Sequence, residues 1–102
     1  MTIDSKPLFG KVALLGIGLI GASMAHAIRR AGLAAHVAGH ARHPETLEIA
    51  NTIGFADSLH DTPIPAVRDA DFVVLATPVG AFGPLAREIA SELKPGAIVS
   101  DV

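Results

Sequence analysis

A length of 102 residues allows one small domain. Half of the residues are hydrophobic and 18% are charged, so a packed core is expected rather than disorder. A formal net charge of −2 gives no general attraction to nucleic acid or to a membrane surface, and no apolar run approaches the roughly 20 residues of a membrane-spanning helix. No cysteine and no visible secretory signal lead us to expect a cytoplasmic protein.

The hydrophobic pattern predicts strands that alternate with helices. Residues 1–10 are interpreted as a polar lead-in, and 11–102 as the domain. In chain order, the predicted elements are a strand at 11–15, a helix at 19–31, a strand at 35–39, a helix at 44–51, a short strand near 55–57, a strand at 71–76, a helix whose apolar face runs from 82 to 93, and a strand that starts at 97.

Alternation of this kind is typical of a parallel sheet with right-handed crossover connections. The connections are short enough for a doubly wound arrangement. We therefore predict a Rossmann-type α/β fold with strand order 3-2-1-4-5, cut short after the fifth strand.

A glycine-rich turn follows the first predicted strand, and it matches the pattern Gly-x-Gly-x-x-Gly at Gly16, Gly18 and Gly21. A strand before it and a helix after it give the context in which this pattern binds a dinucleotide. The three glycines permit the tight turn, the approach to the pyrophosphate and close helix packing, while Leu19 and Ile20 open the helix that faces the diphosphate. The alternative is a glycine turn that serves only packing.

The ribose-reading position of this pattern, about 20 residues further on, falls at Ala41, where there is no carboxylate. A carboxylate binds the ribose hydroxyls and repels phosphate, whereas the guanidinium of Arg42 matches a phosphate. We therefore predict a preference for NADP over NAD, with Arg42 as the main contact to the 2′-phosphate and His43 or His40 as helpers. The alternative is that Arg42 is solvated or stacks on adenine.

Thr77, Pro78 and Val79 leave the end of the strand at 71–76. Ligands of open parallel sheets lie outside the carboxyl ends of the strands, at the point where the strand order reverses. We therefore expect these residues to approach the ribose or nicotinamide, although a proline turn that only starts a helix is the alternative.

The remaining polar residues predict no catalytic group and no metal site. His40 and His43 are interpreted as residues of a solvated loop, because no further ligand is clustered with them. Neither His26 nor His60 has a visible partner for acid–base chemistry. Several aspartates are interpreted as turn and helix-end residues: Asp57, Asp61, Asp69 and Asp71.

Three segments give a more specific signal than the glycine turn alone. They are VALLGIGLIGAS at 12–23, DADFVVLATPVG at 69–80 and LKPGAIVSDV at 93–102. Together they closely resemble the prephenate and arogenate dehydrogenase family, and the resemblance runs over nearly the whole chain from Lys11. The family's usual acidic residue after the second strand is missing at Ala41, so the resemblance leaves the choice between NADP and NAD open.

The resemblance implies an oxidative decarboxylation of prephenate or arogenate in tyrosine biosynthesis. Hydride passes from the hydroxyl-bearing ring carbon to the nicotinamide, and a histidine acts as the base. The resemblance also implies that this histidine and a helical second domain, which carries substrate contacts and a homodimer interface, lie outside this chain. The 102 residues are therefore expected to bind cofactor without turning over substrate.

Two other functions remain open from the sequence. One is the cofactor domain of a different two-domain dehydrogenase or reductase, for example one that acts on hydroxy acids or pyrroline carboxylate. The other is a non-catalytic module that binds a dinucleotide to control a partner. Hydride transfer by the extended chain distinguishes an enzyme from a sensor.

Overall fold

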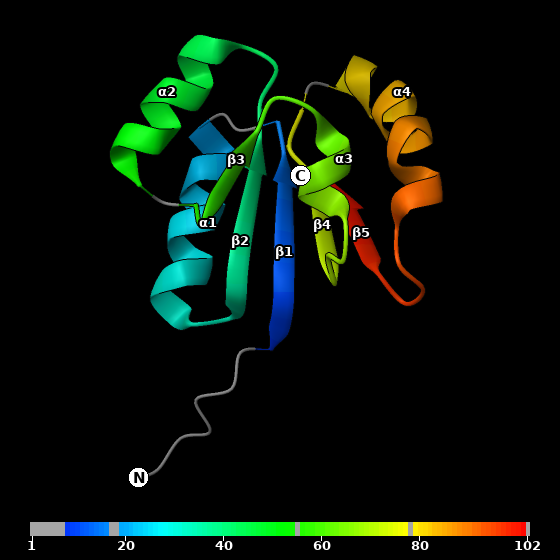
Figure 1. The fold of residues 1–102 in the computed structure, drawn as a ribbon, viewed down its shortest axis with the longest axis horizontal. Helices are drawn as coiled ribbons and strands as arrows, with labels where there is room; N and C mark the ends of the chain where they lie inside the picture. Colours follow the sequence, from blue (N-terminus) through cyan, green and yellow to red (C-terminus); the bar gives the residue numbers. More distant parts are fainter. Residues whose placement is uncertain (1–7, 17–18, 55, 78, 102) are drawn as a thin grey trace, which may run out of the picture.

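The computed structural model describes residues 8–16, 19–54, 56–77 and 79–101 as a series of alternating strands and helices (Figure 1). The strands are β1 (Phe9–Leu15), β2 (Ala34–His40), β3 (Ser58–His60), β4 (Phe72–Leu75) and β5 (Ile98–Asp101). The helices are α1 (Leu19–Ala31), α2 (Pro44–Ile53), α3 (Pro63–Val67) and α4 (Val79–Ile89), and a 3-10 turn at Ala90–Glu92 follows α4.

The strands form one parallel sheet in the order β3-β2-β1-β4-β5. β1 lies at the centre, where Val12 is in register with Val37 of β2 and with Phe72 of β4. The chain first adds strands on the β2 side of β1 and then crosses to the β4 side, so the strand order reverses between β1 and β4. This arrangement confirms the predicted doubly wound sheet and its strand order.

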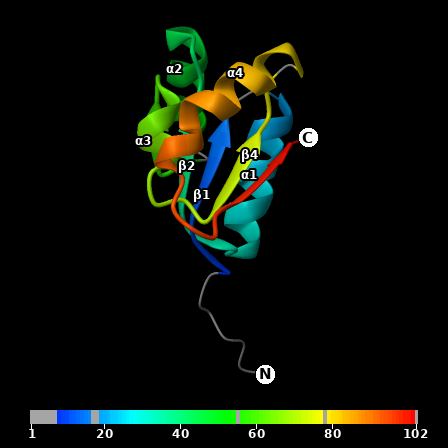
Figure 2. The same ribbon diagram turned by 90° about the vertical axis from the view of Figure 1, so that its right-hand side faces the viewer.

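Helices cover both faces of the sheet (Figures 1 and 2). Because successive side chains of a strand point to opposite faces, β1 supplies both cores. The core on the side of α1 and α2 consists of Val12, Leu14, Ala25, Ile28, Val37, Ala50 and Val74. The core on the side of α3 and α4 includes Ala13, Leu15, Ala66, Val67, Val73, Leu85 and Ile89. Within the described ranges, no helix has the length and apolar character needed to cross a membrane.

The region between α2 and β4 differs from the prediction. The third strand was predicted near 55–57, but β3 covers Ser58–His60. The predicted end of α2, at about Asn51, is also early, because Gly54 in a left-handed conformation closes the helix with a hydrogen bond to the Ala50 carbonyl. The turn-rich stretch after β3 contains α3, whose Pro63 stands at the first helical position, where proline is tolerated.

The start of the domain also differs from the prediction. β1 begins at Phe9 rather than at Lys11, because the Phe9 N–H donates to the Leu33 carbonyl at 2.8 Å. The rings of Phe9 and Phe72 lie 5.2 Å apart, which is a favourable aromatic separation. Part of the predicted polar lead-in therefore belongs to the sheet.

Two aspartates hold the amino ends of the strands. The Asp71 carboxylate accepts hydrogen bonds from the backbone of Gly10 at 2.6 Å and Lys11 at 3.2 Å, and it pairs with Lys94. The Asp57 carboxylate accepts from the backbone of Val37 at 2.7 Å and pairs with an arginine of α1. Asp71 therefore ties the start of β4 to the amino end of β1, at the end of the strands opposite the cavity described below, whereas Asp57 ties the start of β3 to the middle of β2.

Candidate functional site

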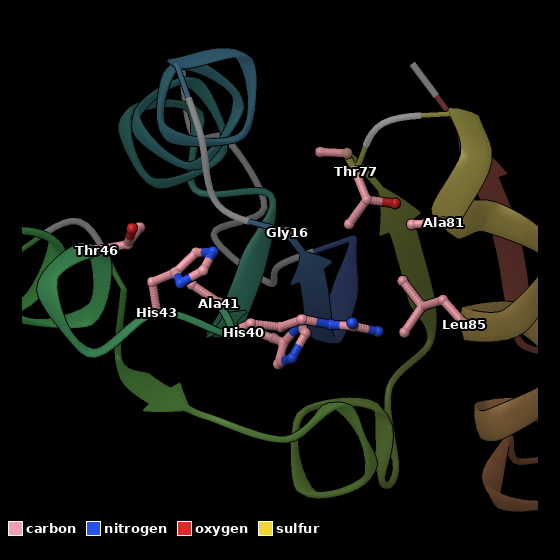
Figure 3. Close-up of a pocket in the computed structure, with 10 residues that line it drawn as sticks. Gly16, His40, Ala41, His43, Thr46, Thr77, Ala81 and Leu85 are labelled. Carbon is pink, nitrogen blue, oxygen red and sulfur yellow. The ribbon is translucent and has the colours of Figure 1, made fainter.

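A cavity of about 370 Å³ lies at the carboxyl ends of β1, β2 and β4 (Figure 3). This is where the strand order reverses and where a ligand of such a sheet is expected. Six residues that the sequence assigned to a cofactor site line the cavity: Gly16, His40 (as a possible helper), Ala41, Arg42, His43 and Thr77. The sequence analysis did not identify four others: Thr46, Ala76, Ala81 and Leu85.

Position 16, the first after β1, requires glycine for two reasons: its backbone conformation and the closeness of Thr77. Its φ of +83° lies in the left-handed region that favours glycine. A Cβ at this position would lie only 2.1 Å from Cγ2 of Thr77, which follows β4. The N–H of Gly16 donates to the His40 carbonyl at 2.8 Å. The ends of three strands therefore meet at a residue that has no room for a side chain.

The rest of the glycine turn is described in part. A Cβ on Gly21 in α1 would lie 3.5 Å from the Gly16 carbonyl, which is an ordinary van der Waals contact. The turn therefore tolerates a methyl group at Gly21 but not at Gly16. Leu19 and Ile20 form the first turn of α1, and Val79 begins α4. Two residues of the predicted site, Gly18 and Pro78, lie outside the described residues.

The loop between β2 and α2 brings a positive charge to the cavity. Ala41 is buried, and its N–H donates to the His60 carbonyl at 3.2 Å. Arg42 and His43 are exposed, and His43 immediately precedes α2 without a side-chain capping hydrogen bond. Among the described residues that line the cavity none carries a carboxylate. The cavity therefore presents Arg42 to a ligand without an opposing acidic group in its lining.

The interpretation of His40 as a residue of a solvated loop is wrong. His40 is the last residue of β2 and is only 1% exposed. Its register with Leu15 places its side chain on the face of the sheet that α3 and α4 cover. The sequence of β2 could have shown that His40 is buried, because the alternation of the strand continues through Gly39 to His40.

Three buried polar atoms at this cavity have no hydrogen-bond partner among the described residues. They are Nδ1 and Nε2 of His40 and Oγ1 of Thr77. Buried polar groups in proteins are nearly always hydrogen-bonded, and an unpaired one is unfavourable. These atoms belong to residues that line the cavity. A ligand with hydroxyl, amino or ring-nitrogen groups would provide the missing partners.

Burial lowers the pKa of His40, and the positive charge of Arg42 lowers this pKa further. Glu88 and Asp61 oppose the effect more weakly. The imidazole is therefore neutral at pH 7, with one nitrogen as donor and the other as acceptor.

A second pair of histidines lies on β2 and β3, outside the residues that line the cavity. Nε2 of His36 and Nε2 of His60 lie 2.8 and 3.0 Å from the Ser58 hydroxyl. Burial lowers the pKa of His60, and the nearby charges of Lys11 and His36 lower it further. Over the residues that the structure describes, no three histidine or acidic side chains are grouped to hold a metal ion.

The lowered pKa values of His40 and His60 predict that the protein loses stability in mild acid. The unfolded chain takes up these protons near the ordinary histidine pKa of about 6.5, whereas the folded chain takes them up only at lower pH. The free energy of unfolding should therefore fall as the pH is lowered from about 7.5 to about 5.5, as measured by urea denaturation. Asp71, whose pKa is lowered mainly by Lys94, titrates below this window.

His60→Gln provides the control for this pH dependence. The variant removes one of the two titrating groups and keeps hydrogen-bonding capacity, so its stability should depend less steeply on pH. A stability that is constant over this range, or an unchanged slope in the variant, would contradict the assignment.

The sheet topology and the cavity define a class of protein. The cavity lies where the strand order reverses, beside a glycine turn that joins β1 to α1. Three buried polar atoms of its lining residues have no hydrogen-bond partner among the described residues. Ala76 and Ala81, which are partly exposed, add apolar surface suited to a planar base. The chain is therefore a nucleotide-binding domain of the Rossmann type.

The family model described as "Prephenate dehydrogenase, nucleotide-binding domain" matches residues 24–102. The match covers well over half of the chain, which therefore belongs to the prephenate dehydrogenase family, as its nucleotide-binding domain. This result confirms the family that the three sequence segments indicated.

Individual relatives agree with this assignment. A cyclohexadienyl dehydrogenase from Zymomonas mobilis is 33% identical over 94 residues, which are 92% of this chain and 32% of the relative. The crystal structure of Synechocystis arogenate dehydrogenase matches with a TM-score of 0.82 and 33% identity, over 90% of this chain and 32% of that one.

A prephenate dehydrogenase from A. aeolicus, solved with hydroxyphenyl propionate and NAD+, also has a TM-score of 0.82. It is 32% identical and matches over 90% of this chain and 32% of its own. The chain thus spans about a third of the length of these relatives.

Proposed function

We propose that this chain is the NAD(P)-binding domain of an enzyme that oxidises prephenate or arogenate. The observation that supports this proposal best is the close approach of Thr77 to Gly16, which leaves no room for a side chain at position 16 and borders the cavity at the point where the strand order reverses. When bound, the nicotinamide cofactor supplies a hydride acceptor for the ring carbon that bears the substrate hydroxyl.

Two parts of the site would hold such a cofactor. The turn at Gly16 and the start of α1, together with Gly18, would bind the pyrophosphate through backbone N–H groups and the helix dipole. Thr77, whose buried hydroxyl has no hydrogen-bond partner among the described residues, would donate to the ribose or the phosphate. Thr77, Pro78 and Val79, which follow β4 in the sequence, would approach the ribose or the nicotinamide.

We further propose that the domain prefers NADP to NAD. Ala41 offers no carboxylate to bind a free ribose diol or to repel a phosphate, and the neighbouring Arg42 lines the cavity. The exposed Arg42 guanidinium can meet a 2′-phosphate with a charge-assisted pair of hydrogen bonds. His43, at the start of α2, lies beside it and would assist.

Calorimetric titration with NADP and NAD tests this preference. Arg42→Ala should weaken NADP binding by about 10- to 100-fold, the range expected for a hydrogen bond between charged groups, and should leave NAD binding within about twofold. The matched control is Arg30→Ala, which removes an exposed arginine from the far end of α1. An Arg42→Ala variant that keeps the wild-type ratio of the two affinities would refute the preference.

For the whole protein, we propose that a catalytic histidine, the substrate contacts and a homodimer interface belong to a helical second domain outside residues 11–102. The relatives named above are about three times as long as this chain, which supports that division. We also propose a cytoplasmic location, since a cysteine-free chain needs no oxidising compartment. Hydride transfer from prephenate or arogenate, measured on a longer protein, tests the activity.

A further inference from the structure

We propose that His40 contacts the adenosine half of the bound dinucleotide through its imidazole, and that it provides the polar contact at the end of β2 that a carboxylate would otherwise make. This inference rests on the proposed nucleotide-binding function. The sequence analysis named His40 only as a possible helper of Arg42 at the 2′-phosphate, and the proposal assigns it a contact of its own with the adenosine.

The position of His40 supports this assignment. Its carbonyl accepts the Gly16 N–H at 2.8 Å, so the end of β2 is tied to the glycine turn. Ala41, one residue later, carries only a buried methyl group and cannot bind a ribose or a base through its side chain. His40 is therefore the last side chain of β2 with polar atoms, and it lines the cavity.

The unpaired state of the His40 ring is the second observation. The side chain is 1% exposed, yet neither Nδ1 nor Nε2 has a hydrogen-bond partner in the described structure. A histidine whose role is only to fill a core usually has a partner for at least one nitrogen, as His36 and His60 have in Ser58. β2 and β3 thus contain two histidines that are hydrogen-bonded to Ser58 and one, His40, that has no partner among the described residues. Of these three histidines, His40 is the one that lines the cavity.

The surroundings of His40 indicate which half of a dinucleotide it meets. It shares the cavity with Arg42 and His43 of the loop after β2, where we place the adenosine ribose and its 2′-phosphate. Ala81 of α4, which is partly exposed, supplies apolar surface for the flat face of a purine. In Figure 3, Gly16 lies between Thr77 and the end of β2 that carries His40. A neutral imidazole offers one donor and one acceptor to the hydroxyl or ring-nitrogen groups of adenosine.

Three measurements on His40→Leu and His40→Gln test the proposal: the melting temperature without ligand, and the affinities for 5′-AMP and for NADP. His40→Leu removes two unpaired buried nitrogens, so its melting temperature should equal or exceed that of the wild type. Its affinities for 5′-AMP and NADP should both fall by about tenfold, the loss expected for one hydrogen bond. His40→Gln, which keeps a donor and an acceptor, should recover part of that loss.

His36→Leu is the matched control. It lies on the same strand and face, but its ring is paired with Ser58, so its melting temperature should fall while its affinity for NADP stays unchanged. Wild-type affinity of His40→Leu for NADP would overturn the proposal, and so would a loss for NADP without a loss for 5′-AMP. A His40→Leu variant that fails to fold, with a His40→Gln variant that binds no better than background, would show a structural role instead.

The same titrations separate this inference from the proposed function. If the folded wild-type chain binds neither NADP nor NAD, the proposed function fails. If the wild type binds and His40→Leu binds equally well, only the role of His40 fails.

Discussion

Gly16→Ala is expected to abolish measurable nucleotide binding and to destabilise the domain by more than the roughly 1–2 kcal/mol that a left-handed backbone costs a residue with a Cβ. The additional loss arises because the new methyl group would overlap Cγ2 of Thr77, 2.1 Å away. Relief of this overlap requires the turn after β1 to move away from the end of β4, which opens the cavity between them. Urea denaturation and calorimetric titration with NADP measure the two effects.

Gly54→Ala separates backbone strain from the steric overlap. Gly54 has a φ of +77°, close to that of Gly16, but a Cβ there would have no neighbour within 4 Å. The control should therefore lose only the backbone contribution and keep its affinity for the nucleotide. If Gly16→Ala were no less stable than Gly54→Ala and still bound NADP, the assigned role of the glycine turn would be wrong.

Leu85→Ala is expected to lose about 2–5 kcal/mol of stability, the usual cost of truncating a large buried side chain to alanine. Leu85 is 1% exposed and packs in the core under α4, but it also lines the cavity. Its truncation should therefore weaken the binding of NADP in addition to the fold. Nucleotide affinity is measured at a temperature at which the variant remains folded.

Ile89→Ala provides the comparison that isolates the effect on the cavity. Ile89 is also 1% exposed and belongs to the same helix and the same core, but it does not line the cavity. Both variants should lose stability within the same range, and only Leu85→Ala should lose affinity as well. Equal affinities in the two variants would place the nucleotide elsewhere on the molecule.

The sequence predicted the strand order because local signals identify the alternating strands and helices, and the rules for crossover connections then give the order. The apolar runs of β1 and β4 and the three- and four-residue steps of α1 and α4 identify these elements without knowledge of their neighbours. The position of β3 could not be read in this way. This strand has only three residues, and it pairs with residues of β2 that lie about 20 positions earlier in the sequence. Its start also depends on where α2 ends, which is at Gly54.

The candidate site was predicted in part for a similar reason. The glycine pattern identified Gly16, because only glycine readily adopts the backbone conformation of that turn. Thr77 was identified because it follows a clearly apolar strand. Leu85 and Thr46 were not identified, since they belong to helices whose distance from the glycine turn depends on how those helices pack. His40 was misread because a histidine after glycine looks polar and exposed, whereas the strand continues through it.

Asp71 stands at the amino ends of β1 and β4, at the opposite end of these strands from the cavity, and this separation matters for protein engineering. We expect substitutions that strengthen the contacts of Asp71 with Gly10 or Lys94 to raise the folding stability without altering the geometry at the carboxyl ends of the strands. Stabilising changes often impair a binding site when both share the same residues. In this domain, thermal stability and the proposed cofactor preference depend on opposite ends of the strands, so each can be changed separately.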